Sequence, residues 1–331
     1  MSGLGPALVT GGTGFIGAHV ARALARRGIE VRCLVREGST LRRLEGVDAT
    51  LRPGDLLDPA SLERAAAGCR ALFHCAADYR LWAPAPDDIL RTNVEGTRNV
   101  LRAAEAAGVA RVVHTSSVGA LAGGTREAPA DESGEVDATA LVGPYKRSKY
   151  LAEREAAAFA ERGLDVVIVN PSTPVGEGDV KPTPTGKVIV DFLRGRMPAY
   201  VDTGLNIIDV RDVAEGHVLA ALHGRTGERY ILGNRNMSLR ELLEALASIA
   251  GRGAPRVRLP HWIPLVAAHA AEAWAGLAGG EPAVSLAAVR MARQPMYFDA
   301  GKAVRELGLP QSPIEPALER AVAWFRAHGY A

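Results

Sequence analysis

A glycine-spaced turn near the start of the chain constrains its fold more than any other feature. Residues 10–17 read Thr-Gly-Gly-Thr-Gly-Phe-Ile-Gly, so Gly11, Gly14 and Gly17 recur at three-residue intervals. A short apolar run precedes the turn, and Phe15–Arg27 has helical periodicity. Glycines here allow a tight turn and close approach of a pyrophosphate, while the helix N-terminus directs free N–H groups at the phosphates. The spacing alone is a weak signal in a chain with 36 glycines, but in this context it predicts a dinucleotide-binding strand–turn–helix unit.

Short β-branched apolar runs alternate with longer helical patterns through the first half of the chain. The predicted strands are Ala7–Thr10, Glu30–Val35, Arg70–Cys75, Arg111–Thr115 and Asp165–Asn170, and the predicted helices are Phe15–Arg27, Ser61–Ala67, Asp87–Ala107 and Pro144–Arg162. Such alternation is typical of strand–helix–strand units that build a parallel sheet covered by helices. We therefore expect an α/β fold with a Rossmann-type, doubly wound parallel sheet.

The pattern becomes irregular after Pro171, where four prolines and three glycines within residues 171–186 predict a long loop region. Later segments predict strands at Asn206–Val210 and Arg229–Leu232 and helices at Val213–Leu222, Leu239–Ile249 and Pro316–His328. We expect a dinucleotide-binding domain over residues 1–172, with returns to its sheet around 205–225. Residues 173–331 are expected to form mainly a smaller, interleaved, substrate-binding domain.

Composition narrows the classes of partner. The chain has 39 Lys and Arg against 37 Asp and Glu, and a net charge of +2 gives no basic field of the kind that attracts nucleic acid or an anionic membrane. Cys33, Cys69 and Cys75 cannot all pair and have no metal-ligand spacing, which favours a reducing, cytoplasmic location and predicts no metal site. No window reaches about 18 uninterrupted apolar residues, so no membrane-spanning helix is predicted.

The end of the second predicted strand bears on the choice of cofactor. It reads Val35-Arg36-Glu37, where a NAD site commonly has an acid that accepts from the ribose hydroxyls. Arg36 can instead pair with a 2′-phosphate, and Arg43 follows closely enough to assist. This favours NADP, with NAD as the alternative because Glu37 follows directly.

A tyrosine and a lysine lie four residues apart in a predicted helix. Tyr145 and Lys149 therefore share one helix face. A free phenol has a pKa near 10, and a nearby ammonium group lowers it by stabilising the phenolate. Ser117 follows the apolar run that ends at Thr115. The order of glycine turn, serine and tyrosine–lysine pair favours acid–base chemistry over a plain surface helix.

Together these motifs resemble the extended short-chain dehydrogenase/reductase superfamily, within its NAD-dependent epimerase/dehydratase family, over essentially the whole chain. The matching segments are Thr10–Gly17, Gly54–Asp58, His74–Ala77, Thr92–Thr97, Thr115–Ser117, Tyr145–Lys149 and Pro171–Gly176. The resemblance implies that the catalytic residues are Ser117, Tyr145, Lys149 and Asn93. With the two arginines, the expected cofactor-binding residues are Gly11, Thr13, Gly14, Phe15, Ile16, Gly17, Arg36, Arg43, Asp55, Leu56, Ala76, Ala77, Tyr145, Lys149, Pro171, Thr173 and Val175.

Two branches of this superfamily compete. The Val35-Arg36 strand end is similar to the dihydroflavonol reductase branch, which uses NADPH. The segments Cys75–Trp82, Asn170–Gly176 and Lys181–Gly186 look most like proteins labelled hopanoid-associated sugar epimerase. Both branches imply a nicotinamide cofactor and a small-molecule substrate.

One departure argues against a sugar nucleotide. Nucleotide-sugar epimerases usually carry an arginine that grips the diphosphate in the strand before Asp212, and the matching residue here is the apolar Leu205. A buried diphosphate without a cation partner is costly. Arg194, Arg196 and Arg293 remain as substitutes.

The resemblance implies a carbonyl reductase or alcohol dehydrogenase. Tyr145 would protonate the developing alkoxide, and Ser117 would hydrogen-bond the carbonyl oxygen. Lys149 would lower the pKa of Tyr145 and bind the nicotinamide ribose, and Asn93 would shape its helix and a proton path. The alternative is an epimerase or dehydratase that recycles tightly bound NAD.

Substrate selectivity is expected in Asp78–Pro86, Glu177–Lys187 and the helix after Pro260, whose apolar and Pro-rich character suits a bulky, partly apolar carbonyl compound. The apolar segment Trp262–Leu277 is predicted to pack on the core, with a substrate entrance or peripheral membrane contact as alternatives. The resemblance also implies a homodimer built from the predicted helices Asp87–Ala107 and Pro144–Arg162.

Overall fold

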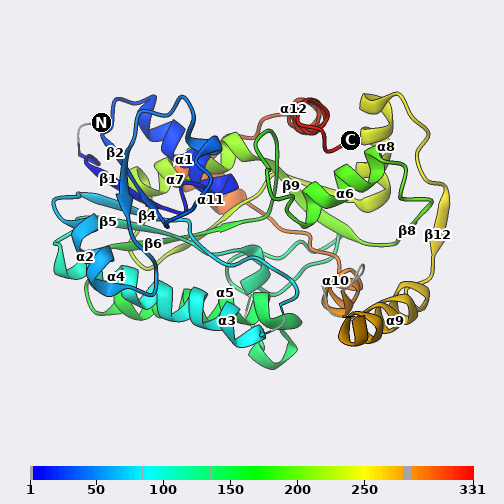
Figure 1. The fold of residues 1–331 in the computed structure, drawn as a ribbon, viewed down its shortest axis with the longest axis horizontal. Coiled ribbons are helices and arrows are strands. Elements are labelled where there is room, and N and C mark those ends of the chain that lie inside the picture. The colour runs from blue at the N-terminus through cyan, green and yellow to red at the C-terminus, as the bar shows by residue number, and fades with distance from the viewer. Residues whose placement is uncertain (1–2, 84, 135, 279–284) are drawn as a thin grey trace.

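A seven-stranded parallel sheet forms one half of the protein, on the left of Figure 1. The computed structural model describes residues 3–83, 85–134, 136–278 and 285–331. The strands run in the order β10 (Arg229–Leu232), β6 (Val166–Pro171), β5 (Arg111–Thr115), β4 (Ala71–His74), β1 (Ala7–Thr10), β2 (Val31–Val35) and β3 (Thr50–Pro53). All neighbours are parallel, and the order reverses between β1 and β4. Ligands of such sheets bind at the carboxyl ends of the strands beside this reversal.

Helices cover both faces of the sheet, which confirms the predicted doubly wound fold. One face packs against α1 (Phe15–Ala25), α7 (Val210–His223) and α11 (Gly301–Leu307), and the other against α2 (Pro59–Ala66), α4 (Gly96–Ala106) and α5 (Gly143–Glu161). Residues of β1 alternate between the two cores, with Ala7 and Val9 on one side and Leu8 on the other. A parallel sheet buried on both faces needs such continuous apolar runs.

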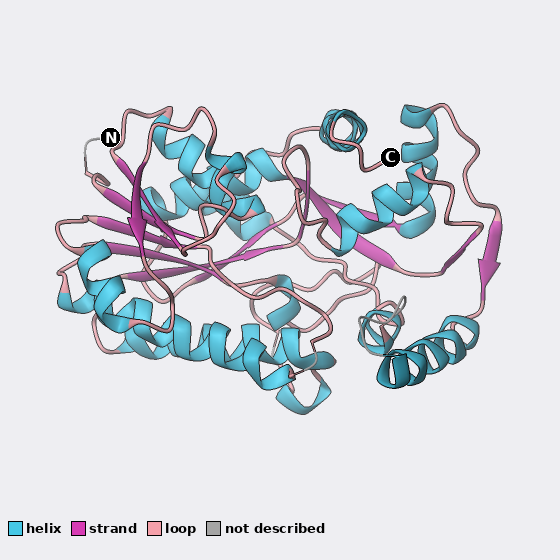
Figure 2. Cartoon of the chain, viewed as in Figure 1, coloured by secondary structure: helices cyan, strands magenta, loops and turns pink. Residues whose placement is uncertain are grey.

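A smaller lobe forms the other half of the protein (Figure 2). It holds a three-stranded sheet of β11 (Arg235–Ser238), β9 (Gly204–Asp209) and β7 (Thr173–Val175), and a pair formed by β12 (Val257–Leu259) and β8 (Ala199–Val201). The helices α6 (Pro184–Leu193), α8 (Leu239–Ala250) and α12 (Ile314–Ala327) enclose its own apolar core. The helix α9 (Trp262–Ala278) packs against α10 (Leu286–Met291) at its edge.

The segment that returns to the large sheet after the first half of the chain differs from the predicted one. Within the range 205–225, α7 packs on the sheet, but β9 joins the three-stranded sheet instead. The strand that completes the large sheet is β10, which pairs with β6. Strands β7 and β9 are short apolar runs with no signal in the sequence that assigns them to a particular sheet.

Two segments differ from their predicted structure. The long helix expected over 87–107 consists of α3 (Pro86–Leu90), a π-helical turn at Arg91–Glu95 and α4. Pro184, taken as part of a loop, is in the first turn of α6, where its missing N–H costs no hydrogen bond. Among the described residues, no helix is long and apolar enough to cross a membrane.

Candidate active site

The glycine turn is built for close approach of backbone to backbone at the end of β1. Gly11 has φ +70°, and a Cβ on it would lie 2.6 Å from the Ala76 nitrogen after β4. A Cβ on Gly17 would lie 2.2 Å from the Gly11 carbonyl oxygen, so α1 sits directly against the turn. Gly14 caps α1, whose first turn carries no acidic residue. The cradle and the free N–H groups of α1 fit a dinucleotide pyrophosphate.

A buried histidine joins the ends of β1 and β4. His74 Nδ1 lies 2.7 Å from Thr10 Oγ1, and its Nε2 lies 3.0 Å from Thr97 Oγ1 on α4. Thr10 Oγ1 also accepts from the Ala76 N–H at 3.3 Å. Both ring nitrogens of His74 therefore have hydrogen-bond partners within the protein. The ring holds the end of β4 against the end of β1 and has no nitrogen left for a ligand.

Ser117 and Tyr145 meet beyond the end of β5. Ser117 caps a short 3₁₀ turn, and its Oγ accepts from the Gly119 N–H at 3.0 Å. A Cβ on Gly119 would lie 3.3 Å from Ser117 Oγ and 3.8 Å from Tyr145 Cε1, so both side chains border this glycine. Burial raises the pKa of Tyr145 above its ordinary value, and the hydrogen bond between its side chain and Ser117 lowers it in part. The pair can polarise and protonate one oxygen atom placed between them.

Lys149 follows Tyr145 by one helical turn on α5 and is buried. Its Nζ donates to the Thr115 carbonyl oxygen at 2.6 Å. Burial lowers the pKa of Lys149 to about 8, against the opposing effects of Glu153 and Cys75. The expected lowering of the Tyr145 pKa is not seen in this structure, because burial dominates at Tyr145 and the ammonium group of Lys149 is held by the Thr115 carbonyl.

A buried carboxylate on α5, for which the sequence gives no functional signal, completes the network. Glu153 accepts from Asn170 Nδ2 at 2.7 Å, from Ser116 Oγ at 2.5 Å and from Arg229 Nη1 at 3.3 Å. It lies one helical turn after Lys149 on α5, and its negative charge raises the pKa of Lys149 against the effect of burial. The i, i+4 spacing of Lys149 and Glu153 was visible in the sequence, but such pairs are ordinarily solvent-exposed.

Asn93 joins the loop after β4 to α5. Its Oδ1 accepts from the Asp78 N–H at 2.7 Å, and its Nδ2 donates to the Asp78 carbonyl and to Ser148 Oγ, both at 2.8 Å. Asn93 sits in the π-helical turn, a distortion that often marks functional sites. Since Ser148 precedes Lys149, this asparagine positions the helix that carries the tyrosine–lysine pair.

The remaining predicted cofactor residues end or follow strands of the large sheet, begin α1 or lie in β7 of the smaller lobe. Arg36 is exposed at the end of β2, and Arg43 donates to the carbonyls of Thr13 at 2.7 Å and Gly178 at 2.8 Å. Asp55 Oδ1 accepts from the Leu57 N–H at 2.8 Å. Leu56 is buried against Gly96, and Ala77 follows Ala76 in the loop after β4. Phe15 and Ile16 begin α1, Pro171 ends β6, and Thr173 and Val175 lie in β7.

The residues expected to bind substrate are only partly described by the structure. Pro84, within the expected loop 78–86, lies outside the described residues, as does the side chain of Leu277. Arg194, a substitute for the missing diphosphate arginine, donates to the Tyr330 carbonyl at 2.6 Å instead. Leu205 lies in β9 opposite Met237. Among the described residues, no group of His, Cys, Asp or Glu could hold a metal ion.

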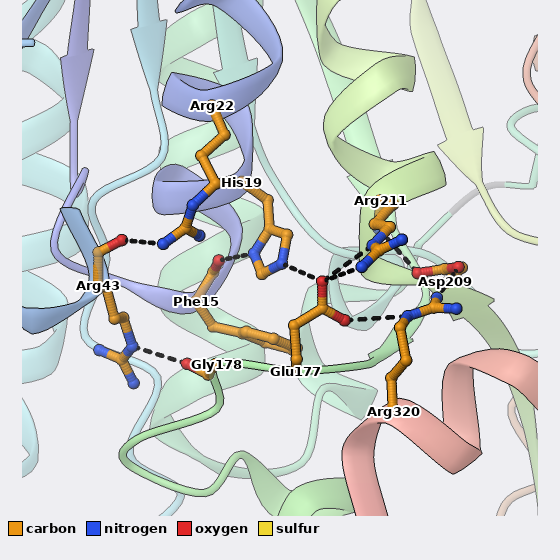
Figure 3. A network of polar contacts seen from close by, with 9 residues as sticks. All are labelled: Phe15, His19, Arg22, Arg43, Glu177, Gly178, Asp209, Arg211 and Arg320. Atoms are coloured by element: carbon orange, nitrogen blue, oxygen red, sulfur yellow. Dashed lines mark hydrogen bonds and ion pairs between the residues drawn. The ribbon is translucent and has the colours of Figure 1, made fainter. Parts of the chain in front are cut away.

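An ion-pair network beside the glycine turn ties the two lobes together (Figure 3). Glu177 accepts from Arg211 Nε of α7 at 2.9 Å and from Arg320 Nε of α12 at 3.1 Å, and it lies 3.6 Å from His19 Nε2 of α1. Arg320 also pairs with Asp209. Burial raises the pKa of Glu177, but the nearby His19 ring and the hydrogen bond from Arg211 outweigh it and hold the pKa below its ordinary value. The carboxylate is therefore a fixed anion between the lobes.

Three buried histidines predict a loss of stability in acid. Burial lowers the pKa of His74 to about 3 and of His217 to about 4, and holds that of His114 well below its ordinary value. In the unfolded chain each histidine ring has a pKa of about 6.5. Below that pH the unfolded state therefore binds more protons than the folded state.

We expect the free energy of unfolding to fall as pH drops from about 6.5 to about 4, by roughly 1.4 kcal/mol per pH unit for each histidine. Urea unfolding across this interval measures the slope. His114→Phe removes one titrating ring and should make the slope shallower. A stability that is constant over the interval would contradict the assignment of these rings as buried and neutral.

A dinucleotide cradle at the reversal of a parallel sheet, beside a serine, a tyrosine and a buried lysine, defines the class of nicotinamide-dependent α/β enzymes. The chain belongs to the NAD dependent epimerase/dehydratase family, whose model matches residues 7–233, and is therefore an NAD(P)-dependent enzyme.

Two curated relatives and one solved structure place it further. It is 50% identical over 326 residues to the "Putative dihydroflavonol 4-reductase" of Synechocystis sp., with 97% of this chain and 95% of that protein covered. It is 34% identical to sterol demethylase protein B of Methylococcus capsulatus, with 97% and 98% covered. The crystal structure of gox2253 is similar over 98% of both chains, with a TM-score of 0.87 and 47% identity. The predicted family and its dihydroflavonol reductase-like character are confirmed.

Proposed function

We propose that the protein is an NADP(H)-dependent oxidoreductase that reduces a ketone or aldehyde to an alcohol, or runs the reverse reaction. The main support for the proposal is that Ser117 and Tyr145 both border Gly119, while the buried Lys149, one helical turn after Tyr145, binds the Thr115 carbonyl at the end of β5. The reductase name of the Synechocystis relative supports the same reaction class. When bound, the nicotinamide supplies or accepts the hydride.

The chain's own residues supply the proton and the hydrogen bonds. Tyr145 would give its phenolic proton to the carbonyl oxygen as the hydride arrives, which yields a neutral alcohol. Ser117 would donate a hydrogen bond to the same oxygen and stabilise the negative charge that develops there. Lys149 would hold the nicotinamide ribose and keep a positive charge near the phenolate. Asn93 would keep α5 in place and complete a proton path.

NADP is proposed over NAD because of the arginines at the adenosine end. Arg36 is exposed at the end of β2, where a 2′-phosphate would lie, and Arg43 is held against the glycine turn by Thr13. An arginine pairs with a phosphate through charge-assisted hydrogen bonds, and it cannot accept from a ribose hydroxyl.

Replacing Arg36 by Asp should therefore reverse or narrow the cofactor preference. We expect the affinity for NADPH to fall by about 10–100-fold, the value of one charge-assisted pair, with little loss for NADH. Fluorescence titration with both nucleotides measures this. Arg196→Asp, an equal charge change on the exposed surface of the other lobe, should leave the preference as it is. An unaltered preference in Arg36→Asp would remove the 2′-phosphate argument.

An epimerase or dehydratase with recycled NAD is the second candidate, and the name of the matched family favours it. The position that commonly grips a sugar-nucleotide diphosphate is Leu205, partly buried between Met237 and Met296. Leu205 itself offers no cation to pair with a diphosphate. This apolar position supports a reductase with a bulky, partly apolar substrate instead.

We also propose a cytoplasmic homodimer. Cys33, Cys69 and Cys75 are free thiols in the structure, as in proteins from reducing compartments. Two copies would pair through α4 and α5, which lie side by side on one outer face of the large sheet. This arrangement would leave α9, at the edge of the smaller lobe, free for another contact.

A further inference from the structure

The helix α9 exposes an unusual apolar stripe to solvent. The exposed fractions are 65% for Trp262, 62% for Val266 and 71% for Trp274. These residues follow one another at intervals of four and eight along the helix, so they share one face, and exposed Ala270 fills the gap between them. Large apolar side chains this exposed on one helix face mark an interaction site.

The one carboxylate of α9 points toward the protein. Glu272 Oε1 accepts from the Leu286 N–H at the start of α10, at 2.7 Å. An ordinary surface helix buries its apolar stripe and exposes its charges. Among the described residues of α9, the apolar stripe is exposed and the carboxylate faces the protein. Packing on the chain's own core therefore does not explain the stripe.

Basic residues surround the stripe. Arg256 and Arg258 flank Val257 in the strand that leads into α9, and Val257 is itself 57% exposed. Arg290 and Arg293 are exposed at the end of α10, which packs against α9. Arg258 pairs with Asp202, and no described acidic residue pairs with Arg256, Arg290 or Arg293.

We propose that α9 is an interfacial helix that docks the protein on an anionic lipid bilayer. Tryptophan side chains prefer the boundary between headgroups and acyl chains, and arginines beside the apolar stripe would meet lipid phosphates. A second copy of the chain fits less well, because a two-fold contact through the stripe would bring the same unpaired arginines together.

The location of α9 connects this surface with the active site. A Cβ on Gly143, at the start of α5, would lie 3.4 Å from the Ala287 Cβ of α10. Tyr145 follows two residues later on α5. The α9–α10 pair therefore adjoins the helix end that carries the proposed acid, and docking would hold that end near the membrane. Resting on the proposed function, the substrate class is a lipophilic carbonyl compound dissolved in the bilayer.

Vesicle flotation of the full-length protein tests the docking without substrate or cofactor. We expect binding to vesicles of phosphatidylcholine with phosphatidylglycerol, weaker binding to pure phosphatidylcholine, and release by salt. Replacing both Trp262 and Trp274 by Ser should weaken binding by about tenfold for each tryptophan. Val304→Ser on α11, which removes an exposed apolar side chain elsewhere, is the matched control and should bind like the wild type.

Absence of binding to both kinds of vesicle overturns the proposal. Light scattering tests whether the stripe instead joins two copies of the chain. If the wild type is oligomeric and does not bind vesicles, and the double tryptophan variant is monomeric, the stripe is a contact between copies. NADPH titration of the same variants confirms that they are folded. Flotation requires no turnover, so a protein that does not bind vesicles would leave the proposed reaction unaffected. A protein that binds vesicles and does not reduce carbonyls would overturn only the proposed reaction.

Discussion

Replacing Tyr145 by Phe is expected to lower kcat for carbonyl reduction by about a hundred- to ten-thousandfold, the usual contribution of a positioned general acid. The substitution keeps the ring that borders Gly119 and removes only the hydroxyl whose pKa Ser117 lowers. Affinity for NADPH should be nearly unchanged, because the cradle at Gly11 lies on a different segment. Steady-state turnover of a water-soluble ketone or aldehyde, with fluorescence titration of NADPH, gives both quantities.

Tyr150 provides the matched control. It lies on the same helix, is partly exposed and lies outside the cluster around Gly119. Tyr150→Phe should retain wild-type turnover. Turnover that survives intact in Tyr145→Phe would end the assignment of this tyrosine as the acid.

The second large effect is expected at Gly17. Its Cβ would lie 2.2 Å from the Gly11 carbonyl oxygen, a backbone atom that cannot turn aside. Gly17→Ala must therefore push α1 away from the turn, and we expect a loss of about 3 kcal/mol in the free energy of unfolding. Weaker NADPH binding should accompany it, because the N–H groups of α1 would move with the helix.

Gly253→Ala is the control for this substitution, since a Cβ there meets no heavy atom within 4 Å. Chemical denaturation compares the two variants on one scale. Equal stability in Gly17→Ala and the wild type would mean that the helix does not rest on the turn as the structure shows.

Most strands and helices of the large sheet could be predicted because they carry their own local signals. Fully buried parallel strands such as β6 are uninterrupted apolar runs, and the helices between them have clear periodicity. Strand β3 was missed because it lies at the sheet edge with all four residues exposed. The π-helical turn around Asn93 was missed because it depends on contacts with Asp78 and Ser148, which are distant in sequence.

The candidate site was predictable in its residue types and less so in its electrostatics. The spacing of Tyr145 and Lys149 placed them on one helix face, as the structure shows. The direction of the Tyr145 pKa depends on burial, which no local pattern reports. Glu153 was overlooked for the same reason, because its carboxylate is enclosed by Ser116, Asn170 and Arg229 from three other segments.

Identification of the nucleotide that the purified protein holds distinguishes the proposed reductase from an epimerase or dehydratase. The protein is denatured, the released nucleotide is quantified by chromatography and mass spectrometry, and the native protein is titrated with NADPH and NADH. A reductase that exchanges its cofactor in each turnover should release no stoichiometric NAD and should bind NADPH more tightly than NADH. Near-stoichiometric NAD would contradict the account, because tightly held NAD is what an epimerase or dehydratase that recycles its cofactor requires.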